Sequence, residues 1–255
     1  MSTREAPMPK AVRPGPAPPP KKRAGKRKAK AAPERVAQIF TRLAAANPEP
    51  KGELECANPY TLLVAVVLSA QATDVSVNKA TLGLFRVADT PKKMVALGEE
   101  KLQERIKTIG LFRTKARNVI ALSEKLIAEH GGEVPREREA LEALPGVGRK
   151  TANVVLNTAF GEPTLAVDTH VFRVAHRLGL ASGKTPLEVE MGLLKVVPAA
   201  YLRHAHHWLI LHGRYVCQAR RPKCDACVVC DLCSSADKWF DCGPPGVATQ
   251  RKASQ

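Results

Sequence analysis

The segment Leu144-Pro145-Gly146-Val147-Gly148-Arg149-Lys150-Thr151 joins two stretches with helical periodicity, residues 137–144 and 149–160. Glycine at both turn positions lets the backbone adopt positive φ and approach a ligand without a Cβ in the way. The unpaired amides of Gly146, Gly148 and Arg149 then lie at the start of the second helix, where the helix dipole favours a phosphate. The segment therefore predicts a hairpin between two helices that binds phosphate. A tight αα-corner that binds nothing is the alternative.

Helical patterns continue on both sides of this hairpin. Few stretches alternate with period two, and Val64–Leu68 is favoured as a helix by the Asn58-Pro59 pair that precedes it. Helices are expected to begin at Pro33 and Pro91 and to span Tyr60–Ser69, Asp74–Phe85, Lys115–His130, Glu137–Leu144, Arg149–Phe160, Thr169–Leu178, Pro186–Val197 and His204–Tyr215. The predicted fold class is all-α.

Charge and composition favour a polyanionic partner. The chain has 255 residues, of which 44% are hydrophobic, and a formal net charge of +16. About half of that charge lies in residues 1–34, so the remaining body is also basic. Residues 1–32 are rich in proline and lysine and are predicted to be a disordered basic tail. No apolar run is long enough for a membrane span, and the N-terminus lacks the apolar region of a secretory signal.

Asp168 is a second candidate site residue. It begins a predicted helix in Val167-Asp168-Thr169-His170, where capping the helix is its ordinary role. A chain reversal at residues 161–163 can bring it back beside Lys150. A lysine near a helix N-terminus has its protonated form disfavoured, which suits a nucleophile, and a nearby carboxylate can accept protons or balance a developing cation. A phosphate contact is the alternative for Lys150.

Five of the seven cysteines lie in a Cys-x6-Cys-x2-Cys-x2-Cys-x2-Cys pattern that ends at Cys233. Such density in a chain without a secretory signal indicates a metal site rather than a disulfide framework. Zinc and a four-iron cluster both use this chemistry. Two ligand sets fit the spacing. One is Cys217, Cys224, Cys227 and Cys233; the other is Cys224, Cys227, Cys230 and Cys233.

Several of these motifs occur in order in a known family. Leu68–Asp74, Ile106–Leu111, Leu144–Phe160, Val167–Arg173 and the cysteine pattern together resemble endonuclease III, a family of helix-hairpin-helix DNA glycosylases. The resemblance runs from about Pro33 to Cys233, which is four-fifths of the chain.

The resemblance implies two helical domains with the DNA cleft between them. Residues 52–162 would form a six-helix barrel that contains the hairpin, and residues 33–51 with 163–235 would form an iron–sulfur domain. Residues 236–255 would be a flexible tail. The resemblance assigns the [4Fe-4S] ligands as Cys217, Cys224, Cys227 and Cys233, and leaves Cys230 as an extra thiol.

The resemblance also implies the chemistry. Lys150 would be the nucleophile and Asp168 the catalytic carboxylate of a base excision repair enzyme that flips oxidised pyrimidines out of duplex DNA. Lys150 would attack the sugar C1′, expel the base through a Schiff base and cut the strand by β-elimination. Gln71 would fill the vacated gap and Leu111 would act as the apolar wedge beside it. The expected DNA contacts are Gln71, Leu111, Gly146, Gly148, Arg149, Thr151 and His170.

Each contact has an ordinary alternative. Leu111 could belong to the core, Gln71 could be a buried amide, and His170 could merely pack. Asp74 is expected to be only a helix cap. Arg220, Arg221 and Lys223 would contact phosphate, whereas His204, His206, His207 and His212 are expected to pack or face solvent, with a second metal site as the alternative.

The sequence bears on two rival functions. The sister adenine glycosylases lack a lysine at the position of Lys150 and carry a glutamate where this chain has Ala65, so we reject that assignment. A non-catalytic DNA-binding module with a structural or redox-sensing cluster stays as the alternative. We expect a monomer that acts on damaged duplex DNA in a bacterial cytoplasm, without a membrane.

Overall fold

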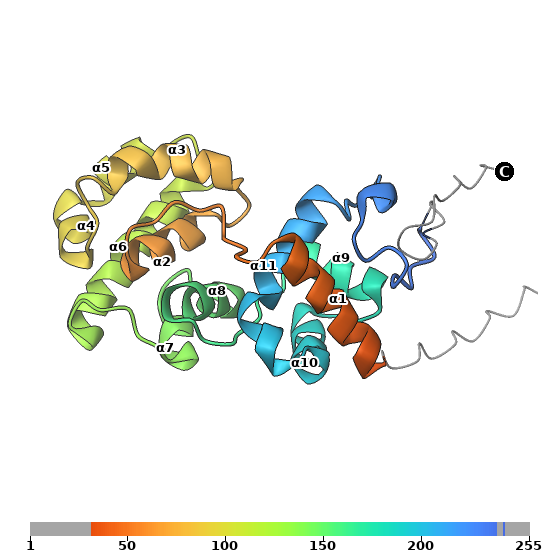
Figure 1. Ribbon diagram of the computed structural model, residues 1–255. Coiled ribbons are helices and arrows are strands. Elements are labelled where there is room, and N and C mark those ends of the chain that lie inside the picture. The colour runs from red at the N-terminus through yellow and green to blue at the C-terminus, as the bar shows by residue number, and fades with distance from the viewer. Residues whose placement is uncertain (1–31, 239–241, 243–255) are drawn as a thin grey trace, which may run out of the picture.

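The computed structural model describes residues 32–238 and Cys242, and this part of the chain is helical without a strand (Figure 1). The predicted all-α fold is confirmed. The two predicted tails, residues 1–32 and 236–255, lie almost wholly outside the described residues. Over the described ranges, no helix combines the length and apolar character that a membrane span requires.

Eleven α-helices and one 3-10 helix follow one another along the described chain. They are α1 Pro33–Ala46, α2 Pro59–Leu68, α3 Asp74–Leu84, α4 Pro91–Leu97, α5 Glu99–Ile106, α6 Phe112–His130, α7 Arg138–Glu142, α8 Arg149–Phe160, α9 Thr169–Leu178, α10 Pro186–Val196, α11 Ala199–Tyr215 and the 3-10 helix η1 Cys224–Ala226.

Side-chain caps fix several helix starts. The Asn58 side chain accepts from the Thr61 amide at 2.8 Å, and the Thr61 hydroxyl accepts from the Asn58 amide at 3.0 Å, which closes a capping box before α2. The expectation that Asp74 caps α3 is wrong. Thr73 is the cap and accepts from the Ser76 amide at 3.3 Å, because Asp74 is already the first residue of the helix.

The first core surrounds α2. This helix is buried from Tyr60 to Leu68, as expected for a helix that is apolar all round. The core continues through α3 to α8 and includes Leu102 of α5 and Leu126 of α6. The segment Val64–Leu68 is thus a helix, as predicted.

The second core joins the start of the chain to its last third. Phe40 of α1 packs against the rings of Tyr201 and Trp208 on α11, with centroids 5.9 and 6.3 Å apart. Buried side chains of α9, α10 and the loop residue Val229 complete this core. Figure 1 shows α1 lying beside α9, α10 and α11, away from α2 to α7. Two cores agree with the division into two domains, whose boundaries stay a prediction.

The sequence-based prediction lacks one helix of the structure and begins two others too late. Seven helices, including the five-residue α7, lie in residues 52–162, where the resemblance implies six. The unpredicted helix is Glu99–Ile106, which buries only Leu102 and Ile106 and so gives little periodicity. Helix α6 begins at Phe112 and helix α11 at Ala199, each earlier than predicted.

Candidate active site

The hairpin before α8 has the predicted positive φ at Gly146 but not at Gly148, whose φ is −103°. Gly146 has φ +78°, and a Cβ placed there would lie 2.9 Å from the side-chain nitrogen of Asn118. Gly148 is the N-cap of α8 and makes no side-chain cap hydrogen bond. The first turn of α8 carries no acidic residue. Its amides and its dipole are therefore available to an anion.

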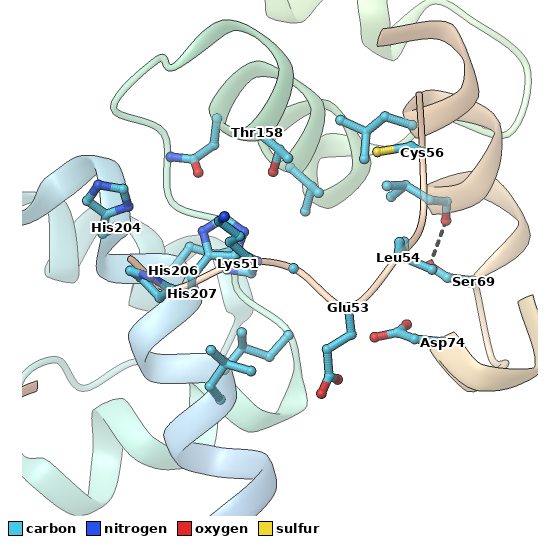
Figure 2. Close-up of a pocket in the computed structure, with 18 of the residues that line it drawn as sticks. Lys51, Glu53, Leu54, Cys56, Ser69, Asp74, Thr158, His204, His206 and His207 are labelled. Atoms are coloured by element: carbon cyan, nitrogen blue, oxygen red, sulfur yellow. Dashed lines mark hydrogen bonds between the residues drawn. The ribbon is translucent and has the colours of Figure 1, made fainter. Parts of the chain in front are cut away.

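Lys150 lines a pocket between the two cores. Its side chain is exposed on the second residue of α8, and the pocket has a volume of about 460 Å³. Figure 2 shows the opposed walls, with His204, His206 and His207 of α11 on one side and Cys56, Ser69 and Asp74 on the other. The volume is in the range of sites that enclose a small ligand.

The lining also contains residues that the sequence analysis did not single out. Lys51 and Cys56 belong to the connection between α1 and α2, and Thr158 and Arg203 belong to α8 and α11. Local sequence patterns carried no signal for them, because their role arises only where the two cores meet.

The predicted reversal after α8 is present and is held by buried amides. Gly161 ends α8 with φ +73°. The Asn157 side-chain nitrogen donates to the carbonyl oxygens of Glu162, Thr164 and Arg203, each at 3.0 Å. These bonds fix the return of the chain toward Asp168, which caps α9 by accepting from the Val171 amide at 2.8 Å.

Asp168 does not itself line the pocket, but it and Lys150 act on one buried imidazole. The His206 side chain is 4% exposed, and its Nδ1 lies 2.9 Å from the carbonyl oxygen of Ala166. Since that oxygen can only accept, Nδ1 carries the hydrogen. Burial lowers the pKa of His206 to about 4; the charge of Asp168 raises this pKa and that of Lys150 lowers it. The charges of the two predicted residues therefore act in opposite directions on the pKa of the same histidine.

The side chain of Arg149 has a partner that the sequence did not predict. Its Nε and Nη2 donate to the two carboxylate oxygens of Glu190 on α10, at 2.9 and 2.7 Å. The Glu190 side chain is 5% exposed. The backbone amide of Arg149 still belongs to the first turn of α8, so the predicted phosphate contact can involve only that amide while the ion pair lasts.

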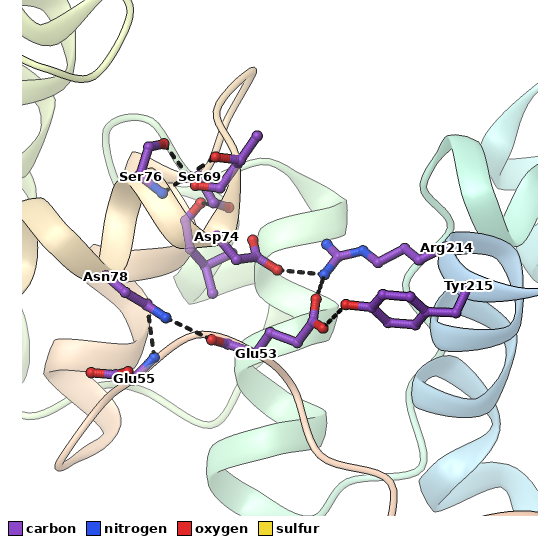
Figure 3. Close-up of polar contacts among 10 residues, drawn as sticks. Glu53, Glu55, Ser69, Asp74, Ser76, Asn78, Arg214 and Tyr215 are labelled. Carbon is purple, nitrogen blue, oxygen red and sulfur yellow. Dashed lines mark hydrogen bonds and ion pairs between the residues drawn. The ribbon is translucent and has the colours of Figure 1, made fainter.

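A second ion-pair group joins the two cores beside the pocket. Arg214 of α11 donates through Nη1 to Asp74 of α3 at 2.5 Å and also to Glu53. The hydroxyl of Tyr215 donates to the other oxygen of Glu53 (Figure 3). We call Glu53, Asp74, Arg214 and Tyr215 the clasp.

Gln71 and Leu111 share an unusual backbone. They have φ values of +54° and +61°, and no other non-glycine residue in the described part of the chain has positive φ. Leu111 is 61% exposed and Gln71 is also exposed, so the alternatives of a core leucine and a buried amide are wrong. Left-handed conformations at non-glycine residues are strained and concentrate at functional sites.

Thr151 and His170 are the remaining predicted contacts. Thr151 is half-buried in the first turn of α8. His170 is also half-buried, and its Nδ1 lies 3.3 Å from Nη2 of Arg173. His170 does not line the pocket, so its DNA contact stays a prediction.

Four free thiols gather after α11. Burial, together with the neighbouring Cys233, Cys217 and Cys224, raises the pKa of Cys227 to about 12. Arg177 donates through Nη1 to the Cys217 sulfur at 3.6 Å. Burial also raises the pKa of Cys233, and a thiol whose pKa is raised becomes a thiolate readily when a metal binds it.

Cys217, Cys224, Cys227 and Cys233 form an all-thiol donor set, which a [4Fe-4S] cluster uses and which a zinc ion can also use. The Cys230 sulfur lies against that of Cys242. The choice between the two ligand sets, with Cys230 outside the one that the resemblance implies, stays a prediction.

The phosphate contacts that were predicted outside the hairpin lie on the cysteine loop. Arg220, Arg221 and Lys223 line a second, open hollow on the cysteine loop together with Arg177. Asp225 and Asp237 share this hollow.

Comparison with known proteins gives consistent matches. Residues 64–199 match the HhH-GPD superfamily of base excision DNA repair proteins. The chain is 61% identical over 198 residues to endonuclease III of Treponema pallidum, covering 78% of this chain and 94% of that protein. It is 59% identical over 201 residues to endonuclease III of Escherichia coli, covering 79% and 95%. A solved structure of a trapped endonuclease III–DNA covalent intermediate matches with a TM-score of 0.75 and 46% identity, covering 80% of this chain and 96% of that one.

Proposed function

The chain belongs to the endonuclease III family of the HhH-GPD superfamily, and within this family of base excision repair glycosylases and lyases we propose that Lys150 is its nucleophile. The observation that carries the proposal is the position of Lys150, exposed on the first turn of α8 and lining the pocket between the two cores. Asp168, the N-cap of α9 where the chain returns after the reversal at Gly161, is proposed to supply the carboxylate.

The reaction follows from these groups. The enzyme extrudes an oxidised pyrimidine nucleotide, because C1′ cannot be reached inside the base stack. The Lys150 amine forms a bond to C1′ while the bond from C1′ to the base breaks, and the Asp168 carboxylate balances the positive charge that develops on the sugar. The sugar ring then opens to a Schiff base. Loss of a 2′ proton expels the 3′ phosphate and cuts the strand.

The surrounding surface positions the DNA. The amides of Gly146, Gly148 and Arg149 bind backbone phosphate at the start of α8, with Thr151 beside them. Gln71 and Leu111 enter the gap that the extruded nucleotide leaves. This role accounts for the positive φ of both residues. His170 lies at the start of α9 for a further contact.

Cys217, Cys224, Cys227 and Cys233 would hold a [4Fe-4S] cluster. When bound, such a cluster supplies a redox-active centre with its own visible absorbance. The protein residues around it do other work: Arg177 donates to Cys217, and Arg220, Arg221 and Lys223 present positive charge to phosphate.

We further propose the domain boundaries 52–162 for the barrel, and 33–51 with 163–235 for the cluster domain. The bacterial origin of the matched relatives supports a place on chromosomal DNA in a bacterial cytoplasm, where the enzyme acts as a monomer.

Borohydride trapping tests the proposal. The purified enzyme is incubated with a duplex that contains one oxidised pyrimidine, and the Schiff base is reduced to a stable adduct. We expect the adduct to vanish in Lys150→Ala and to form slowly in Asp168→Asn. Lys51→Ala, which removes another amine of the same pocket, is the matched control and should still trap. DNA binding without an adduct in the unchanged protein would instead favour the non-catalytic module.

A further inference from the structure

We propose that the Arg149–Glu190 ion pair is a positioning device that holds Lys150 in register with Asp168, and that the Arg149 side chain is not a DNA contact. The inference rests on the proposed function, because it concerns how that nucleophile is placed. It starts from an arginine that sits directly before the nucleophile yet points into the protein.

The contact is bidentate and crosses between the cores. Arg149 is the first residue of α8, whose apolar face belongs to the first core, and Glu190 lies on α10 in the second core. Both carboxylate oxygens of Glu190 are used, at 2.9 and 2.7 Å. A planar guanidinium in this arrangement fixes direction as well as distance.

The electrostatics keep Arg149 where it is. Glu190 is 3% exposed overall, and Arg149 is the only cation for which a contact with it is seen among the described residues. Releasing Arg149 to a phosphate would leave a buried, unpaired carboxylate, which is strongly unfavourable. Hydrogen bonding to Glu190 raises the pKa of Arg149, and the charges of Glu142 and Glu139 raise it further. This acidic surrounding also opposes the approach of a phosphate to the side chain.

The pair connects the two catalytic groups. Lys150 follows Arg149 directly, and Asp168 is the N-cap of α9. Helix α10, which carries Glu190, packs against α9. The ion pair therefore fixes the first turn of α8 against the pair of helices that begins at Asp168. A shift of about 1 Å between reacting groups can lower a rate by about 100-fold.

The test uses Glu190→Gln, which removes the charge with little change of volume, together with Arg149→Lys and Arg149→Met. The single-turnover rate of borohydride trapping is measured at saturating DNA, and the affinity for DNA is measured between 50 and 200 mM salt. We expect Glu190→Gln and Arg149→Met to trap about 10- to 100-fold more slowly with an unchanged salt slope. Arg149→Lys should recover part of the rate. The double variant that combines Glu190→Gln with Arg149→Met should trap no more slowly than the slower of those two single variants, because both changes remove the same contact.

Arg221→Met is the matched control for a phosphate contact. It should bind DNA more weakly, with the salt slope reduced by about one. The inference is overturned if Arg149→Met behaves like Arg221→Met, or if Glu190→Gln traps at the normal rate. Failure of all the pair variants to fold, judged by thermal unfolding, would also overturn it in favour of a purely structural pair. Absence of an adduct in the unchanged enzyme would instead contradict the proposed function itself.

Discussion

Replacing Arg214 with methionine removes the cation of the clasp while keeping a side chain of similar length. Asp74 and Glu53 then lose their contact with the guanidinium, and Glu53 keeps only the Tyr215 hydroxyl of the clasp. The Asp74 side chain is 16% exposed and the Glu53 side chain is 34% exposed. Arg214 contacts both from α11, so the change acts on the junction between the two cores.

The expected loss of stability comes mainly from Asp74. A buried polar group left without its partner costs about 1–3 kcal/mol, more for a charged group, whereas an exposed ion pair contributes about 0–1 kcal/mol. Asp74 is close to the first case and Glu53 to the second, so we expect a loss of about 2 kcal/mol. Since 1 kcal/mol shifts the melting temperature of a chain this size by about 2–4 °C, the expected decrease is about 4–8 °C.

Thermal unfolding of the cluster-loaded protein measures this loss. A double-mutant cycle with Asp74→Asn isolates the contact, and the double variant should be less destabilised than the sum of the two single variants. Lys93→Met is the control, because it breaks an exposed ion pair with Asp89 at 2.8 Å and should change stability by less than about 0.5 kcal/mol. If Arg214→Met is as harmless as Lys93→Met, or the cycle is additive, the reasoning about the clasp is refuted.

Three further variants give distinct outcomes. Burial lowers the pKa of His206 to about 4, below its ordinary value of 6.5. The neutral imidazole therefore stabilises the fold above pH 6.5, and this contribution is lost as the pH falls toward 4. In His206→Gln the decrease in melting temperature over that range should be smaller, by the equivalent of about 3 kcal/mol, and an unchanged pH profile would contradict the neutrality of His206. Gly146→Ala should destabilise the fold by about 1–3 kcal/mol because of its positive φ, whereas Gly148→Ala, which meets no atom within 4 Å, should keep the melting temperature and weaken DNA binding; equal melting temperatures would refute the distinction. Cys227→Ser should lose the visible absorbance of the cluster and Cys230→Ser should retain it, and the reverse result would mean that the ligand set is wrong.

Local rules explain which parts of the fold were predictable. Three helices begin with a cap residue followed directly by proline, so two adjacent residues indicate where each helix begins. The cap residues are Asn58, Thr90 and Thr185. Helix α5 escaped prediction because only Leu102 and Ile106 are buried over its eight residues.

The site was predictable only in part. Lys150 and Asp168 lie in motifs, and the reversal at Gly161 that joins them is visible in the sequence. The clasp was not predictable, because Arg214 is 161 residues from Glu53 and 140 from Asp74. The partner of Arg149 lies 41 residues away. Such pairs depend on how the two cores meet, which no local pattern encodes.

Mapping the reduced adduct by peptide mass spectrometry tests the central claim most directly. Trapping on a lesion-containing duplex, followed by nuclease and protease digestion, leaves a sugar remnant on the lysine that attacked. We predict the added mass on the peptide that contains Lys150. The same mass on the peptide that contains Lys51, the other lysine of the pocket, would contradict the account.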